Sequence, residues 1–224
     1  MVFELFRGGG GSQVDVVEAQ LREMLATTRE TFGMAIDALT GRVAPEAVGK
    51  PLRKADRTVN KVERRIRREL VVHAGVRGAE ADVPLLLTYM SIAKDIERVG
   101  DMAKDIWDLA AAGADLGTGP DRDEVLRHAD AISRLIDETA RVFTERDAER
   151  ATELLRETDA LKDRHEEAML AQLRADGPPS RAVAYALLSR YFHRIAAHLM
   201  NVLTAVVMPL DRLDYWDEDK VDRT

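Results

Sequence analysis

Two distant segments of this chain carry the same apolar stripe, and this repetition constrains the fold more than any other feature. Apolar side chains at steps of three and four residues line one face of an α-helix. Because the two stripes agree position for position, we predict that the two helices are equivalent elements of a duplicated unit. The first stripe contains Ile92, Ile96, Val99, Ala103, Ile106 and Ala110, and the second contains Leu188, Phe192, Ile195, Leu199, Val202 and Val206.

Proline and glycine divide the chain into six helical segments. Pro45 and Pro84 stand where helices are expected to begin, because the first turn tolerates proline, and Gly177 with the two following prolines ends another helix. We expect the last helix to continue past Pro209 with a kink there. The predicted helices span residues 13–41, 45–73, 82–112, 121–146, 148–175 and from about 180 onward.

Long helices with short connections and no alternating strand pattern favour antiparallel bundles. We therefore predict an all-α fold of two tandem antiparallel three-helix bundles, with repeats at residues 13–115 and 121–215. A flexible tail is expected at residues 1–12, where the string MVFELFR precedes four glycines, and a C-terminal tail at residues 216–224. The N-terminal tail is either disordered or touches a membrane or a partner.

Charge and apolar content exclude several classes of protein. The net charge of −7 argues against general binding of DNA or RNA. The apolar runs are far shorter than a membrane span, and the N-terminus lacks the apolar core of a signal peptide, so a cytoplasmic protein is expected. One basic cluster, interleaved with Glu63 and Glu69, is either a solvated helix face or a docking patch for an acidic partner. Its members are Lys61, Arg64, Arg65, Arg67 and Arg68.

The residues also limit the chemistry. The chain has no cysteine, so any metal must be held by oxygen or imidazole. No glycine-rich phosphate loop follows a predicted strand, and nothing proposes a serine or threonine activated by a histidine. We therefore expect a protein that is not an enzyme.

An acidic ladder lies on the helix predicted for residues 82–112. Glu97, Asp101 and Asp105 follow one another at steps of four in the string DIERVGDMAKDIWDL. Carboxylates at this spacing repel by a few tenths of a kcal/mol, and a multivalent cation would compensate for that repulsion. The ladder lies nearly opposite the apolar stripe, so we expect these acids to be accessible.

The preceding helix offers a second set of oxygen donors. Asp56, Asn60 and Glu63 share a flank beside its apolar stripe, and together with the ladder they form an oxygen-rich set that suits Mg, Mn, Fe or Ca. The alternative is an ordinary charged face, because Lys94 and Lys104 stand three residues from acids of the ladder.

The string IERVGDMAKDI resembles the repeated signature of PhoU-like proteins, bacterial and archaeal regulators of phosphate uptake. The resemblance implies two tandem three-helix bundles and a metal ion cluster, with iron first and Mn, Mg, Zn or Ca as alternatives. Glu97 and Asp101 match the two acids of the motif, and Asp56 matches the first acid of its counterpart on the preceding helix. Asn60 stands at the second position of that counterpart, and Asp105 stands where the family often has asparagine.

The second repeat departs from the motif. Its string reads FHRIAAHLMNV, so His193 and Ala197 replace the two acids while Asn201 remains. The second metal cluster is therefore expected to be lost, reduced or specialised, although acids remain on the preceding helix. We expect His165, which falls on an apolar flank, to be a buried and hydrogen-bonded histidine rather than a ligand. The acids that remain are Asp159, Asp163 and Glu166.

The resemblance implies a regulator that lowers phosphate uptake and phosphate signalling. Its expected partners are the cytoplasmic components of a phosphate transporter, a sensor histidine kinase, or both, with membrane association through the partner; a homo-oligomer is possible. The alternatives are a metal-free regulator or adaptor of another ion transport system and a carboxylate-bridged metal enzyme. Such an enzyme needs inward acids and a Glu-x-x-His pair, which the ladder does not show.

Overall fold

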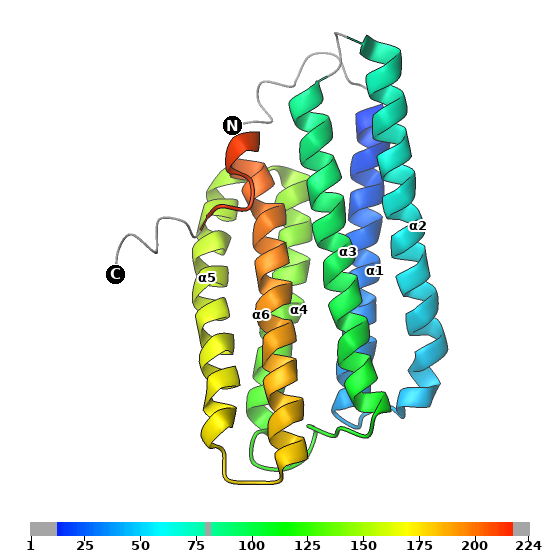
Figure 1. The fold of residues 1–224 in the computed structure, drawn as a ribbon. Helices are drawn as coiled ribbons and strands as arrows, with labels where there is room; N and C mark the ends of the chain where they lie inside the picture. Colours follow the sequence, from blue (N-terminus) through cyan, green and yellow to red (C-terminus); the bar gives the residue numbers. More distant parts are fainter. Residues whose placement is uncertain (1–12, 79–81, 217–224) are drawn as a thin grey trace.

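The computed structural model describes residues 13–78 and 82–216, and the fold of these residues is all-helical (Figure 1). The predictions for residues 1–12 and 217–224 lie outside the described residues. The long helices are α1 (Gln13–Leu39), α2 (Pro45–Arg77), α3 (Val83–Ala111), α4 (Arg122–Glu145), α5 (Ala148–Ala171) and α6 (Pro179–Val207). Two short 3₁₀ turns, η3 (Gln172–Arg174) and η4 (Leu210–Arg212), follow α5 and α6. None of the described helices is long and apolar enough to cross a membrane.

Helix ends follow the chemistry of the flanking residues. Asp82 caps α3 by accepting a hydrogen bond from the backbone N–H of Leu85 at 3.1 Å, and Asp147 caps α5 in the same way through Arg150 at 2.9 Å. The expectation that the last helix continues past Pro209 is wrong. The helix ends at Val207 and the next residue is extended, because a proline disfavours helical geometry in the residue before it.

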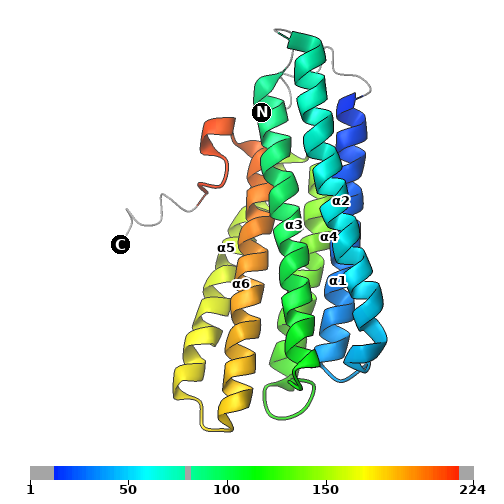
Figure 2. The ribbon, with the colours of Figure 1, turned by 45° about the vertical axis from the view of Figure 1, so that its right-hand side comes forward.

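The two predicted bundles lie side by side and share one hydrophobic core (Figures 1 and 2). Helices α1, α2 and α3 pack against one another, α5 packs closely on α6, and α3 contacts α6 between the two bundles. Every residue of both apolar stripes is buried, which confirms the stripes as core faces. Phe32 of α1 and Phe192 of α6 meet across the two bundles with ring centroids 5.9 Å apart. The repeats are therefore packed as one unit.

The loop between the repeats depends on a glycine. A Cβ atom added at Gly117 would lie 1.8 Å from the backbone carbonyl oxygen of Thr40, far inside van der Waals contact. The neighbouring Leu116 donates its backbone N–H to the carbonyl of Leu39 at 3.0 Å, which holds the loop against the end of α1. The loop cannot accept a side chain here without moving.

We expect Gly117→Ala to lower the free energy of unfolding by about 1–3 kcal/mol, because the added methyl group overpacks a backbone contact. Urea unfolding of purified protein measures this change. Gly75→Ala is the matched control, since its Cβ meets nothing within 4 Å and alanine favours the helix. Equal stabilities of the two variants would show that the loop moves at no cost.

Candidate metal-binding face

Helix α3 occupies the centre of the molecule, and this position decides how far its acids are exposed. Glu97 is only 8% exposed, and Asp101 and Asp105 are half-buried. The expectation of an accessible ladder is therefore wrong for Glu97. Helices α1 and α2 pack on α3 from one side and α6 packs from another, so little of its circumference faces solvent.

Two acids of the ladder form ion pairs within α3. The Nζ atom of Lys94 lies 2.5 Å from Oε2 of Glu97, and Nη1 of Arg98 lies 3.4 Å from Oδ2 of Asp101. Both pairs join residues three apart, which are neighbours on a helix surface. The basic residues of α3 thus offset part of the negative charge of the ladder.

The pKa of Asp101 is raised, in part by negative charges on α2 and α3. Burial raises its pKa first, and the carboxylates of Glu97 and Asp56 raise it further. Lys104 and Arg98 act in the opposite direction. Because a neighbouring charge shifts a pKa only at short range, Asp56 of α2 shares one electrostatic environment with the two motif acids of α3.

Glu63 and Asn60 lie on α2 beside a hollow of about 260 Å³. Glu63 is 6% exposed, and its Oε1 atom lies 2.6 Å from Nη2 of Arg67. The guanidinium of Arg67 therefore compensates the charge of this buried carboxylate. The hollow is lined by Arg57, Asn60, Lys61, Glu63 and Arg64.

Asp105 belongs to a different environment. Burial raises its pKa, the nearby Asp108 raises it further, and Lys104 and Arg194 lower it. Arg194 lies on α6, so Asp105 faces the second repeat rather than Asp56. The charges that shift the pKa of Asp101 thus include Asp56 and Glu97, and those that shift the pKa of Asp105 do not.

The donor set fits a hard cation by its chemistry, because it consists of carboxylate and amide oxygens. Three of its carboxylates, those of Glu63, Glu97 and Asp101, form ion pairs with basic residues of their own helices. Within residues 13–78 and 82–216, no three His, Cys, Asp or Glu side chains are arranged to hold a metal ion.

A polar cluster that the sequence did not predict lies between α3 and α6. Asp95, 8% exposed, lies 2.8 Å from Nδ1 of His198 and accepts a hydrogen bond from Nδ2 of Asn201 at 3.0 Å. Burial and the carboxylate of Asp95 raise the pKa of Asp214 to about 6, while His198 opposes that rise. The sequence held no signal for this cluster, since its members are brought together only by the packing of α3 on α6.

Two histidine rings pack against each other inside the second bundle. His165 is fully buried, as expected, but neither ring nitrogen has a hydrogen-bond partner among the described residues, so the expected hydrogen bonding is not found. Its ring packs edge-on against His128 of α4, with centroids 4.8 Å apart. Burial lowers the pKa of His165 to about 3, and electrostatic repulsion from His128, Arg164 and His193 adds to that effect.

The second copy of the motif has a different electrostatic character. Burial lowers the pKa of His193, and Lys162 and Arg190 lower it further, while Glu166 and Asp163 of α5 act in the opposite direction. The remaining acids of α5 thus lie near a half-buried imidazole, where α3 carries a carboxylate at the matching position of the motif.

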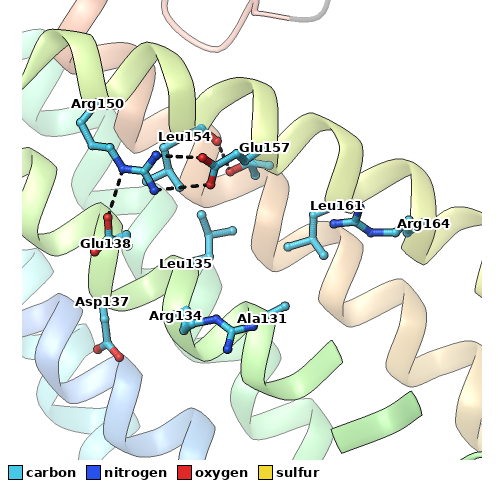
Figure 3. Close-up of a pocket in the computed structure, with 11 residues that line it drawn as sticks. Ala131, Arg134, Leu135, Asp137, Glu138, Arg150, Leu154, Glu157, Leu161 and Arg164 are labelled. Atoms are coloured by element: carbon cyan, nitrogen blue, oxygen red, sulfur yellow. Dashed lines mark hydrogen bonds and ion pairs between the residues drawn. The ribbon is translucent and has the colours of Figure 1, made fainter. Parts of the chain in front are cut away.

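A groove of about 530 Å³ lies between α4 and α5, which contact each other over few residues (Figure 3). Arg150 bridges its walls, with Nε 3.2 Å from Oε2 of Glu138 and Nη1 2.8 Å from Oε1 of Glu157. Leu135, Leu154 and Leu161 also line it. Arginines and acids balance along this groove, so it offers no excess charge to a ligand.

Comparison with known proteins places the chain. The family model of the PhoU domain matches residues 21–110 and residues 125–206, one segment in each bundle. A curated relative from Synechocystis sp., described as a phosphate-specific transport system accessory protein PhoU homolog, is 26% identical over 196 residues, which cover 85% of this chain and 86% of the relative.

Two crystal structures share the fold. PhoU from Pseudomonas aeruginosa has a TM-score of 0.71 at 22% identity, over 89% of this chain and 97% of that chain. The phosphate transport system regulatory protein PhoU from Streptococcus pneumoniae has a TM-score of 0.72 at 15% identity, over 90% of this chain and 95% of that chain. With both of its repeats matched by the family model, this chain belongs to the PhoU domain family.

Proposed function

We propose that this protein is a non-enzymatic regulator of a phosphate transport system. The observation that carries the proposal is the PhoU domain match in both bundles, supported by a relative of similar length named as a transport-system accessory protein. In this proposal the protein lowers phosphate uptake and signalling. It docks on the cytoplasmic components of the transporter, on a sensor histidine kinase, or on both.

Cells that lack the gene test the regulatory role. We expect them to take up more phosphate from a phosphate-rich medium than wild-type cells, and a plasmid copy of the gene should restore the lower rate. Uptake of radiolabelled phosphate measures the effect. Unchanged uptake in the deletion strain, with altered uptake of another ion, would reassign the protein to a different transport system.

The proposal includes a metal on the face between α2 and α3. Asp56, Glu97 and Asp101 are its first ligands, because the carboxylates of Asp56 and Glu97 both act on Asp101. Asn60, Glu63 and Asp105 are lesser candidates. Iron is the first candidate metal, followed by Mn, Mg, Zn and Ca. A bound cation would neutralise these acids and hold α2 and α3 at a fixed spacing.

Glu97→Gln with Asp101→Asn tests the metal. After purification without chelator, we expect the metal content of the double variant to be about tenfold lower than that of the wild type, or lower still. Both substitutions remove a charged oxygen donor. Elemental analysis and the melting shift on adding Fe or Mn measure this loss. Glu149→Gln with Glu153→Gln, an exposed acid pair four residues apart on α5, is the matched control. Equal metal content in both double variants would contradict the assignment.

A metal-free regulator is the second candidate, and the ion pairs within α3 favour it. Lys94 and Arg98 already offset Glu97 and Asp101, so the face is not wholly uncompensated. A wild-type protein that carries no metal, shows no melting shift with added Fe or Mn, and still lowers phosphate uptake in the deletion strain would establish this candidate.

A further inference from the structure

The end of α2 and the start of α3 project beyond the ends of the other helices (Figures 1 and 2). Several apolar side chains at this end of the helix pair are exposed. On α2, Val71, Val72 and Val76 are 64%, 55% and 79% exposed, and on α3, Val83 and Leu87 are 51% and 49% exposed. We call these residues the apolar tip. Exposed apolar side chains that gather at one place mark a surface that contacts another molecule or a membrane.

A basic collar lies directly behind the tip on α2. Glu63 and Glu69, which alternate with basic residues in the sequence, turn inward: Glu63 is buried, and Glu69 accepts hydrogen bonds from Nε2 of Gln20 at 2.9 and 3.1 Å. The outward side of this stretch therefore presents positive charge, although the whole chain carries −7. The exposed residues of the collar are Lys61, Arg64, Arg65, Arg67 and Arg68.

The spacing along α2 places the collar and the tip at different depths. At about 1.5 Å of rise per residue, Arg68 lies about 6 Å and Arg64 about 12 Å behind Val72 along the helix axis. An apolar end followed by arginines matches the order of acyl chains and phosphates at a bilayer surface. Arginine side chains can also extend toward the phosphates while their stems cover apolar surface.

We propose that the apolar tip and basic collar dock end-on onto a bilayer that contains anionic lipids. A protein groove that binds one helix recognises one narrow face. Here the apolar residues come from two helices, and the collar spreads over about half the circumference of α2 at 100° per residue. A bilayer that the apolar tip enters end-on surrounds α2, so the tip meets the acyl chains while the arginines behind it reach the phosphates. This docking goes beyond the proposed function, because it requires no protein partner.

The test is co-sedimentation of the purified full-length chain with vesicles. We expect binding to vesicles of phosphatidylcholine with about 30% phosphatidylglycerol, little binding to phosphatidylcholine alone, and a loss of binding in high salt, because the collar attracts the anionic surface electrostatically. No binding to the anionic vesicles at low salt would overturn the proposal.

Paired variants assign the binding to this surface. Arg64→Ser with Arg68→Ser is expected to weaken it about 30-fold, since each basic residue near the surface contributes about 1 kcal/mol. Val72→Glu with Val76→Glu should weaken it at least as much. All four positions are exposed, so folding should be kept, and circular dichroism checks this. The matched controls are Arg156→Ser with Arg174→Ser and Leu173→Glu with Val183→Glu, which make the same changes at exposed positions elsewhere.

Two outcomes would contradict the proposal even if vesicles bind. Equal loss in the control variants would show that total charge, not the collar, drives binding. Unchanged binding of the tip variants would assign the membrane contact to another part of the chain. A dimer in sedimentation velocity that Val72→Glu with Val76→Glu dissociates, without vesicle binding, would instead make the tip a contact between two copies.

Discussion

Phe192→Ala is expected to lower the free energy of unfolding by about 3–5 kcal/mol, the range typical of a large aromatic side chain removed from a packed core. The side chain of Phe192 is 1% exposed. Its ring lies 5.9 Å from that of Phe32 in the first repeat and 5.3 Å from that of His165 in the second, measured between centroids. The cavity would therefore open between the two repeats, where neither can collapse without the other.

Urea unfolding followed by circular dichroism measures this loss. Because the core is continuous, we expect one cooperative transition in both the wild type and the variant. Leu187→Ala is the control on the same helix, and as a partly exposed position it should change stability by less than about 1 kcal/mol. Two separate transitions, with only one shifted by Phe192→Ala, would show that the repeats unfold independently.

Acid is expected to destabilise the protein through His165. Its pKa falls from 6.5 to about 3 on folding, first because of burial. Between these values the unfolded chain binds a proton that the folded chain excludes, so stability falls as the pH falls below 6.5. The loss from this one group approaches about 1.4 kcal/mol per pH unit and amounts to about 2 kcal/mol at pH 5.

His165→Leu should remove this contribution. We expect the variant to be at least as stable as the wild type at pH 7.5, because two buried ring nitrogens without partners are replaced by apolar atoms. At pH 5 the variant should have gained about 2 kcal/mol relative to the wild type. Urea unfolding at pH 7.5, 6.5, 5.5 and 5.0 provides the comparison, with His73→Leu at a half-buried position of α2 as control. Parallel pH profiles for wild type and His165→Leu would refute this assignment.

The two proposed contact surfaces occupy different levels of the same helix pair. Glu97 follows Val83 by 14 positions on α3, which corresponds to about 21 Å along the helix axis. A molecule that docks on a bilayer through the apolar tip would hold the acidic face at that distance from the lipid. Membrane contact and partner contact could then occur together, and the vesicle and metal experiments separate them.

Helix positions were predictable because they depend on local chemistry. The predicted third helix, residues 82–112, corresponds to Val83–Ala111, and its start is set by Asp82 and Pro84. The error at Pro209 has an equally local cause, since Met208 is already extended before the proline. The buried stripes confirm that helical spacing alone identified the core faces of α3 and α6.

The site was less predictable, because burial there depends on neighbours far away in the sequence. A helical wheel of α3 places Glu97 opposite the apolar stripe of that helix. The wheel considers one helix alone, so it does not show that α6 covers another side of α3. The same packing joins Asp95 to His198 and Asn201. These contacts link residues of different repeats, so no spacing within one helix indicates them.

The helices, their apolar stripes and the repetition of the stripe could be read from residue types at fixed local spacing. Which charged side chains face solvent depended instead on how the helices pack. Glu63 and Glu69 turn inward and leave a basic collar, Glu97 is covered, and His165 is buried with no hydrogen bond to any residue that the structure describes. The physical reason is that desolvation and charge neutralisation act through space, between side chains that only the packing of the helices brings together.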